Sequence, residues 1–362
     1  MNPLGVWQEW DKEVGRVLAG VGVWSRRALA LFSLGVALEK ACSLARVAGV
    51  VPGEATVPST TRRFERLLAN ERLDVRAARG AVGAAILARA RGQRLWLALD
   101  ETHQGRTPSG ARLGMLALRL VDHERALPLA WVCYRPGAAP AAFATLIADL
   151  IAEVAALLPP ATTVVLLTDR GLSWPAVLDQ CRQVGWSFLG RVQHTTRVQT
   201  TDGHCGPIGD LAPRPGTRWQ GHGQAFLKAG WRDLNVVAVW RRGDKEPWLL
   251  VTDLPPAWVR CAQYRHRMDE EQRFRDDKSS GFDREHSHVR TPEHMDRLLL
   301  VLQLAAAFVL ALGLHVLHQG GRTILERQDR RTLSLFSLGL RWLDRARFHL
   351  LPLSPRLVFP FP

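Results

Sequence analysis

Two short stretches decide the fold: RLWLALDET, residues 94–102, and TTVVLLTDRG, residues 162–171. Each is a run of apolar and β-branched residues that ends in an aspartate, Asp100 in the first and Asp169 in the second. Short apolar runs bounded by polar residues are typical of buried strands. We therefore predict two central strands, each of which ends at a carboxylate.

The order of the elements around these strands determines the topology. In chain order they are the strand at 94–102, strands at 112–121 and 124–134 joined by a polar turn, a helix at 140–158, the strand at 162–171, a helix at 174–185 and a strand at 186–193. This β-β-β-α-β-α-β order, with an antiparallel hairpin followed by parallel crossovers, predicts an α/β fold with a ribonuclease-H-like mixed sheet. The first and fourth strands are neighbours in that sheet, so Asp100 and Asp169 are expected to lie close together.

The rest of the chain divides by its texture. Residues 1–90 have the pattern of helices broken by Gly and Pro, and short alternating stretches after residue 193 indicate β-structure. A charged helix is expected at 257–280 and an apolar helix at 291–318. We predict an all-helical N-terminal DNA-binding region at 1–90, the first part of the core at 91–193, a β-rich insertion at 194–257, the closing helices of the core at 258–318 and a basic C-terminal region at 319–362.

The chain is strongly basic. Its 48 Lys and Arg against 34 Asp and Glu give a formal net charge of +14, which indicates a polyanionic partner, either nucleic acid or an anionic membrane surface. Arginine favours nucleic acid, because its planar fork binds phosphate in a bidentate manner. Arg62, Arg63 and Arg66 recur at helical spacing, and we expect them to contact DNA; a solvated helix face is the alternative.

Cysteine and apolar patterns limit the cellular setting. Five scattered cysteines without a CxxC pair predict a reducing cytosol, with neither a disulfide framework nor a zinc ribbon. Residues 298–314 are almost wholly apolar and are just long enough for a short membrane span. A buried core helix is the better interpretation of that segment, since it is a single stretch within a basic chain.

The stretch YRHRMDEEQRFRDDK, residues 264–278, offers a third acid. At about 100° per residue, one narrow face of a helix there carries a phenol, a guanidinium, a carboxylate and an ammonium. These four residues are Tyr264, Arg267, Glu271 and Lys278. Such a face suits a metal ion beside a DNA phosphate, whereas a solvated face with i,i+4 ion pairs is the alternative.

Three carboxylates together predict a metal centre. Asp100, Asp169 and Glu271 provide the oxygen ligands that Mg²⁺ and Mn²⁺ prefer, and two such ions about 3.5 to 4 Å apart can clamp both oxygens of a phosphoryl transfer. An aspartate at one strand end often only caps a turn. Two of them on neighbouring strands favour the metal interpretation.

The spacing Y-x2-R-x3-E-x6-K resembles the YREK signature of a group of bacterial cut-and-paste insertion-sequence transposases with an Asp-Asp-Glu (DDE) triad, the insertion sequence four type. The resemblance covers roughly Leu95 to Leu314. It implies that the three acids, Asp100, Asp169 and Glu271, bind two Mg²⁺ or Mn²⁺ ions and are catalytic. It also implies that Tyr264, Arg267 and Lys278 hold phosphates at the transposon end.

The resemblance further implies that tryptophans of the insertion hold a base flipped out of the DNA end. Four tryptophans lie there: Trp219, Trp231, Trp240 and Trp248. Packing in a small β core is the alternative for each of them. Trp231 and Trp248 are taken as the DNA-binding candidates.

The implied activity is that of a DNA transposase, a metal-dependent endonuclease and strand transferase that cuts the ends of its element and joins them to target DNA. The implied partners are double-stranded DNA, as transposon ends and as target, and a second copy of the chain on that DNA. The implied location is the bacterial cytoplasm at the nucleoid, with no membrane. The alternatives are a metal-dependent nuclease on the same fold, a catalytically dead DNA-binding regulator descended from a transposase, and a membrane-attached protein.

Overall fold

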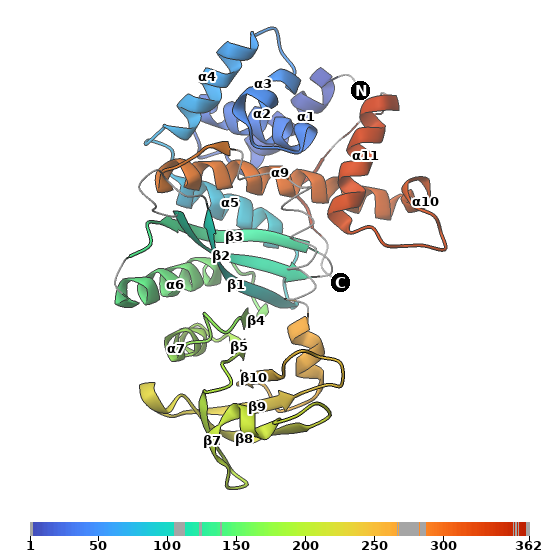
Figure 1. The fold of residues 1–362 in the computed structure, drawn as a ribbon. Helices are drawn as coiled ribbons and strands as arrows, with labels where there is room; N and C mark the ends of the chain where they lie inside the picture. Colours follow the sequence, from blue (N-terminus) through green and yellow to red (C-terminus); the bar gives the residue numbers. More distant parts are fainter. Residues whose placement is uncertain are drawn as a thin grey trace.

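The structure is a computed structural model. It describes residues 3–104, 113–122, 125–137, 140–265, 267, 282, 287–349, 351, 353 and 355–359. In Figure 1, helices from the N-terminal region, a long mixed sheet and a β-rich end follow one another from top to bottom.

The N-terminal region contains α1 (Pro3–Val17), α2 (Val23–Glu39), α3 (Leu44–Val50), α4 (Val57–Leu68) and α5 (Val75–Leu87). The side chains of Thr56 and Asp74 accept a backbone N–H at the starts of α4 and α5. Such caps satisfy donors that have no partner inside the helix.

The sheet joins ten strands of the described chain in the order β3-β2-β1-β4-β5-β10-β9-β8-β6-β7. The first five in chain order are β1 (Arg94–Gln104), β2 (Leu113–Asp122), β3 (Arg125–Tyr134), β4 (Thr163–Thr168) and β5 (Ser187–Arg191), with α6 (Pro140–Ala155) and α7 (Pro175–Gln183) as crossovers. β1 pairs antiparallel with β2 and parallel with β4. The predicted adjacency of the first and fourth strands is therefore present.

The β-rich insertion continues this same sheet. Its elements are β6 (Arg197–Thr200), β7 (Cys205–Pro207), η1 (Ile208–Leu211), β8 (Arg218–Ala225), η2 (Leu227–Ala229), β9 (Arg232–Val239) and β10 (Trp248–Thr252). β10 runs antiparallel to β5, with Val251 opposite Gly190. The pairing covers the edge that β5 would otherwise expose, and an uncovered edge invites association with other chains.

Alternation along the strands divides the sheet into two faces. Leu97 and Leu99 of β1 belong to the main core, whereas Ala98, together with Val165 and Leu167 of β4, belongs to a smaller cluster on the opposite face. Residues 259–265 are helical and contribute Cys261 and Tyr264 to that smaller cluster. Asp100 and Asp169 come two residues after Ala98 and Leu167, so strand alternation places them on this same face, beneath the helix.

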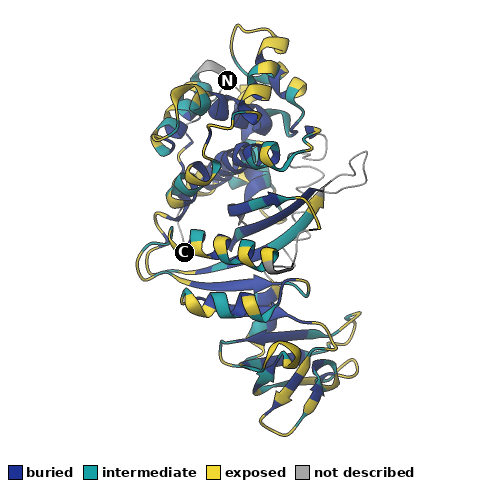
Figure 2. Cartoon of the chain, turned by 90° about the vertical axis from the view of Figure 1, so that its left-hand side faces the viewer, coloured by how far each residue is buried: buried dark blue, intermediate teal, exposed yellow. Residues whose placement is uncertain are grey.

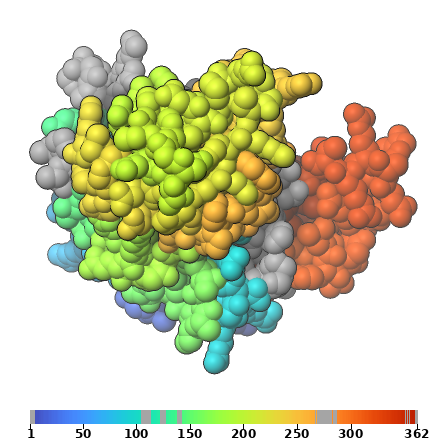
Figure 3. All heavy atoms as spheres, turned by 90° about the horizontal axis from the view of Figure 1, so that it is seen from below, coloured from blue at the N-terminus to red at the C-terminus, as the bar shows by residue number. Residues whose placement is uncertain are grey.

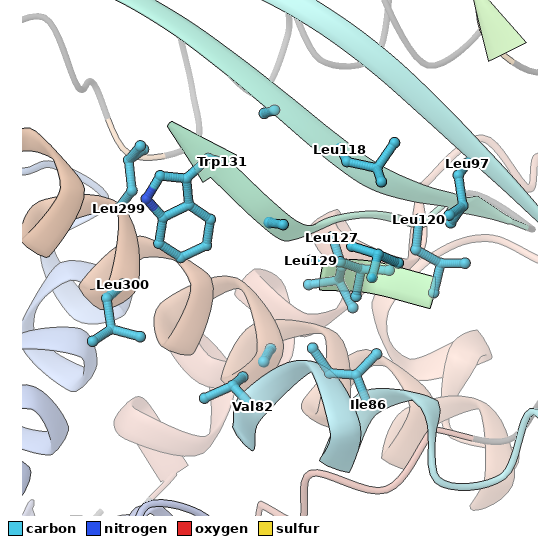
Figure 4. Packing of buried hydrophobic residues seen from close by; sticks show 14 of the residues in the cluster. Val82, Ile86, Leu97, Leu118, Leu120, Leu127, Leu129, Trp131, Leu299 and Leu300 are labelled. Atoms are coloured by element: carbon cyan, nitrogen blue, oxygen red, sulfur yellow. The ribbon is translucent and has the colours of Figure 1, made fainter. Parts of the chain in front are cut away.

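α9 (Pro292–His318) is the central helix of the main core and contacts α2, α4, α5, α11 (Leu335–His349) and β3. The Thr291 side chain accepts the backbone N–H of His294 and caps its start, close to the predicted helix start at residue 291. Figure 4 shows Leu299 of α9 beside Trp131 of β3, with Val82 and Ile86 of α5 nearby. The helix is long and apolar enough to cross a membrane, but 78% of its most apolar window is buried in the protein, and Figure 2 shows this interior in dark blue.

Residues 356–357 of the C-terminal region contact α1 at Glu13. Its carboxylate is fully buried and accepts bonds from Arg16 (2.8 Å), the Leu357 amide (2.8 Å) and Arg356 (3.2 Å). Leu357 and Phe359 are buried in the main core. The C-terminal region otherwise contains α10 (Arg322–Leu325) and α11, and the red C-terminal part projects to one side of the molecule in Figure 3.

Glu13→Gln is expected to reduce the free energy of unfolding by about 1–3 kcal/mol at pH 7, because it weakens the acceptor of a buried amide. Burial raises the pKa of Glu13, but the bonds from Arg16, Leu357 and Arg356 outweigh it, so the net pKa lies below the ordinary 4.5. A lowered pKa means that the stabilisation is complete above pH 4.5 and is lost as the pH falls through the folded-state value.

Urea unfolding of the wild-type protein and of Glu13→Gln at pH 7 and near pH 4 checks this prediction. The difference between their free energies of unfolding should be smaller near pH 4. The exposed Glu54 supplies the control, and Glu54→Gln should leave the unfolding curve in place. A gap that stays constant across this pH range would show that the Glu13 charge does not hold the tail.

Candidate active site

The strand register places the two aspartates side by side. Leu99 of β1 pairs with Thr168 of β4 at the end of the parallel ladder, and Asp100 and Asp169 are the next residues. β4 ends at Thr168, but β1 continues to Gln104 against β2. The expectation that Asp100 ends its strand is thus wrong: it ends only the pairing with β4, because residues 101–104 keep their pairing with the hairpin.

A single guanidinium nitrogen lies between the two carboxylates. Nη2 of Arg267 is 3.4 Å from Oδ1 of Asp100 and 3.7 Å from Oδ2 of Asp169. Because both distances start from the same nitrogen, the separation of Asp100 Oδ1 and Asp169 Oδ2 cannot exceed the sum of the two. Arg267 is 5% exposed, so the attraction acts in a partly desolvated site. The structure brings together three of the predicted site residues.

Asp169 is oriented by the turn that follows it. Its Oδ1 accepts the amides of Gly171 (2.9 Å) and Leu172 (3.0 Å), while its carbonyl accepts the Ser173 hydroxyl (2.6 Å). An aspartate that binds the backbone two residues ahead fixes a turn without help from other elements. Oδ2 faces Arg267.

Tyr264 anchors the helix to the strand end. It is 1% exposed, and its hydroxyl donates to the carbonyl of Thr168 at 3.0 Å. Its ring packs edge to face on Trp248, with centroids 5.7 Å apart. The family resemblance implies a DNA phosphate as the ligand of Tyr264; in the structure the hydroxyl donates to the residue before Asp169. In this geometry Tyr264 positions Arg267 over the two aspartates.

Arg119 of β2 is a site residue that the sequence reading missed. Its Nη1 lies 3.3 Å from Oδ2 of Asp100, and its side chain is 12% exposed. Burial lowers the pKa of Arg119, opposed by the Asp100 charge and supported by that of Arg267. An arginine inside the apolar run LALRLV was the available signal, because a buried cation needs a charged or polar partner.

The donors fit Mg²⁺ or Mn²⁺. Asp100 and Asp169 present hard carboxylate oxygens on neighbouring backbone segments, which these ions prefer over nitrogen or sulfur. Glu271 and Lys278 lie outside the described residues. Within the described ranges no group of three or more His, Cys, Asp or Glu side chains converges, so the pair of aspartates is the part of the centre that can be placed.

Basic residues surround Trp248 beside this site. The guanidinium carbons of Arg191, Arg241 and Arg265 lie 5.9, 6.0 and 6.0 Å from its ring centre. Glu246 pairs with Arg191 and with Arg170, the residue after Asp169, each at 2.8 Å. The pKa of Glu246 lies below its ordinary value, mainly because Glu246 accepts a hydrogen bond from Arg170 and also because the positive charges of Arg191 and Arg170 lie close to it. Phosphate and stacked bases are suitable ligands for such a surface.

The other predicted DNA-binding residues are spread out. Trp219 donates to Asp202 (2.9 Å) and Trp240 to the Asp244 carbonyl (3.1 Å), while Trp231 is partly exposed between η2 and β9. On α4, Arg62 and Arg66 are exposed and Arg63 is partly buried. Burial and the neighbouring Arg27 lower the pKa of Arg63.

A family model described as the transposase DDE domain matches residues 92–308. The matched segment begins just before β1 and ends inside α9, so it contains both aspartates, Arg119, Arg267 and the insertion. No curated protein matches the chain.

Proposed function

Because this chain belongs to the transposase DDE domain family, we propose that it cuts the ends of an insertion sequence and joins them to target DNA by two-metal, cut-and-paste phosphoryl transfer. The observation that carries the proposal is the convergence of Asp100 and Asp169 on one guanidinium nitrogen. We further propose membership of the YREK group, with Glu271 as the third acid and Lys278 beside it.

The chain's own residues would act by holding and orienting. Asp100, Asp169 and Glu271 would hold two Mg²⁺ or Mn²⁺ ions, which when bound supply charge neutralisation at phosphorus and activate the attacking oxygen. The Asp169 turn and the Tyr264 bond to Thr168 keep the ligand-bearing segments in register. Arg267 would bind the DNA phosphate once it leaves the aspartates, since its planar fork suits phosphate oxygens.

DNA would follow the basic surface. Arg191, Arg241 and Arg265 lie around Trp248, and Glu246 links Arg191 to Arg170, the residue after Asp169. This basic surface would hold the transposon end, with Trp248 as a stacking platform for an extruded base. Trp231, Arg62, Arg63 and Arg66 would add contacts farther along the DNA. Two ends must be held together for cut-and-paste chemistry, so a homodimer on DNA, at the bacterial nucleoid, belongs to the proposal.

Incubation of pre-cut element ends with a supercoiled target plasmid tests the function. A transposase is expected to give end–plasmid products whose formation requires Mg²⁺ or Mn²⁺. A nuclease would cut DNA without joined products, and a dead regulator would bind ends without either reaction. Asp169→Asn protein is the control, because it should bind the same ends and join none.

A further inference from the structure

Arg119 lies on the apolar side of the carboxylate site. It pairs across the sheet with Ala98, two residues before Asp100, so its side chain shares a face with both. Ala98, Val121, Val165 and Leu167 form the apolar cluster on that face. A guanidinium in such surroundings loses hydration, and the charge of Asp100 offsets that loss.

The two arginines contact different oxygens of Asp100. Arg267 faces Oδ1 and lies between the two aspartates, where a divalent cation would be shared. Arg119 faces Oδ2, 3.3 Å away, outside that position. Arg119 stands on a strand paired on both sides, whereas Arg267 is a helical residue three positions after Tyr264. One guanidinium thus comes from the sheet, and the other lies near both aspartates, which would hold a shared cation.

We propose that Arg119 is a positioning residue: it holds Asp100 through Oδ2 so that Oδ1 faces Asp169, and a divalent cation replaces Arg267 while the Arg119 contact persists. This inference rests on the proposed function. Hydrogen-bonding partners of metal ligands fix the orientation of those ligands, and their loss typically costs about 10–100-fold in metal affinity or activity.

The sign of the effect makes the proposal sharp. Arg119→Met removes a positive charge that repels a bound cation, so this electrostatic effect alone would strengthen metal binding. A positioning role gives the opposite result, because an unheld Asp100 must be ordered when the cation binds. We expect the half-saturating Mn²⁺ concentration to rise about 10–100-fold.

The experiment measures Mn²⁺ binding to the full-length protein by calorimetry, beside the thermal midpoint and the Mn²⁺ dependence of cleavage. Arg119→Met is compared with Arg119→Lys, which keeps the charge and should restore part of the affinity. Arg79→Met is the matched control, because Arg79 is a buried arginine whose carboxylate partner is Glu153, at 2.7 Å, rather than an aspartate of the site. It should lower the thermal midpoint and leave Mn²⁺ binding unchanged.

Two results would overturn the proposal: tighter Mn²⁺ binding in Arg119→Met, or behaviour identical to Arg79→Met. Asp100→Asn separates these outcomes from a failure of the proposed function. If Asp100→Asn still cuts DNA, the assignment of Asp100 to the active site is wrong. If it does not cut and Arg119→Met binds Mn²⁺ normally, only the positioning role fails.

Discussion

Asparagine at Asp100 or Asp169 is expected to reduce DNA strand cleavage in Mg²⁺ at least about 10³-fold, because a neutral amide cannot hold a divalent cation and about 4 kcal/mol of transition-state stabilisation is lost. The substitution keeps the shape of the side chain. Gel-shift affinity for element ends should therefore remain measurable. Glu271→Gln is expected to behave in the same way, which tests the third acid directly.

Asp179→Asn provides the control for these variants. Asp179 of α7 is a partly exposed carboxylate bound to Arg232 at 2.9 Å, away from the two-aspartate site, and its loss should leave the cleavage rate within about twofold, since exposed pairs contribute little. The assignment fails for any of the three acids whose variant cleaves and joins at the normal rate.

Gly339→Ala is expected to release α11 from α9 and lower the free energy of unfolding by about 3 kcal/mol or more. A Cβ built at Gly339 would lie 1.9 Å from the carbonyl oxygen of Val309, and one at Gly313 would lie 2.2 Å from that of Leu335. These neighbours are backbone atoms of packed helices. They cannot rotate away as a side chain would, so the two helices must separate.

Urea unfolding and limited proteolysis of 319–334 measure this effect, because a released α11 exposes the connection that precedes it. The matched control is Gly49→Ala in α3, where an added Cβ meets nothing within 4 Å. That change should be neutral or should stabilise the helix by up to about 1 kcal/mol. Equal unfolding curves for the two variants would show that the helices tolerate a wider crossing.

The core topology could be predicted because local patterns determine it. The apolar runs in 94–102 and 162–171 indicate buried strands, and the order of hairpin and crossovers specifies which strands are neighbours. Together they place Asp100 beside Asp169. The helical spacing likewise places Tyr264 and Arg267 on the side that meets this edge.

Partners at long range could not be read from the sequence. The pattern of 248–252 predicts a strand, but nothing in it specifies β5 as its neighbour. Arg119 looks like a charge interrupting an apolar strand until Asp100 is seen beside it. Gly313 and Gly339 similarly look like weak points in helices, whereas in the structure they permit close contact.

Tyr264 shows a different limit. The face argument groups it with Arg267 and Glu271, but a phenol combines an apolar ring with a polar tip, so its face does not reveal whether the hydroxyl meets solvent or backbone. In the structure the hydroxyl donates to the carbonyl of Thr168, and a contact with a DNA phosphate stays a prediction. Glu271 and Lys278 lie outside the described residues and stay predictions.

Because the strands pair without a break from β4 through β5 to β10, the insertion and the core form one continuous sheet. Thr252 and Asp253 tie the end of β10 to Phe188 of β5 through side-chain bonds of 2.6 and 2.8 Å. If DNA binding displaced the outer strands β8, β6 and β7, the displacement would pass through the paired strands to the Asp169 turn. Substrate geometry and carboxylate geometry would then change together, without a flexible joint to absorb the strain.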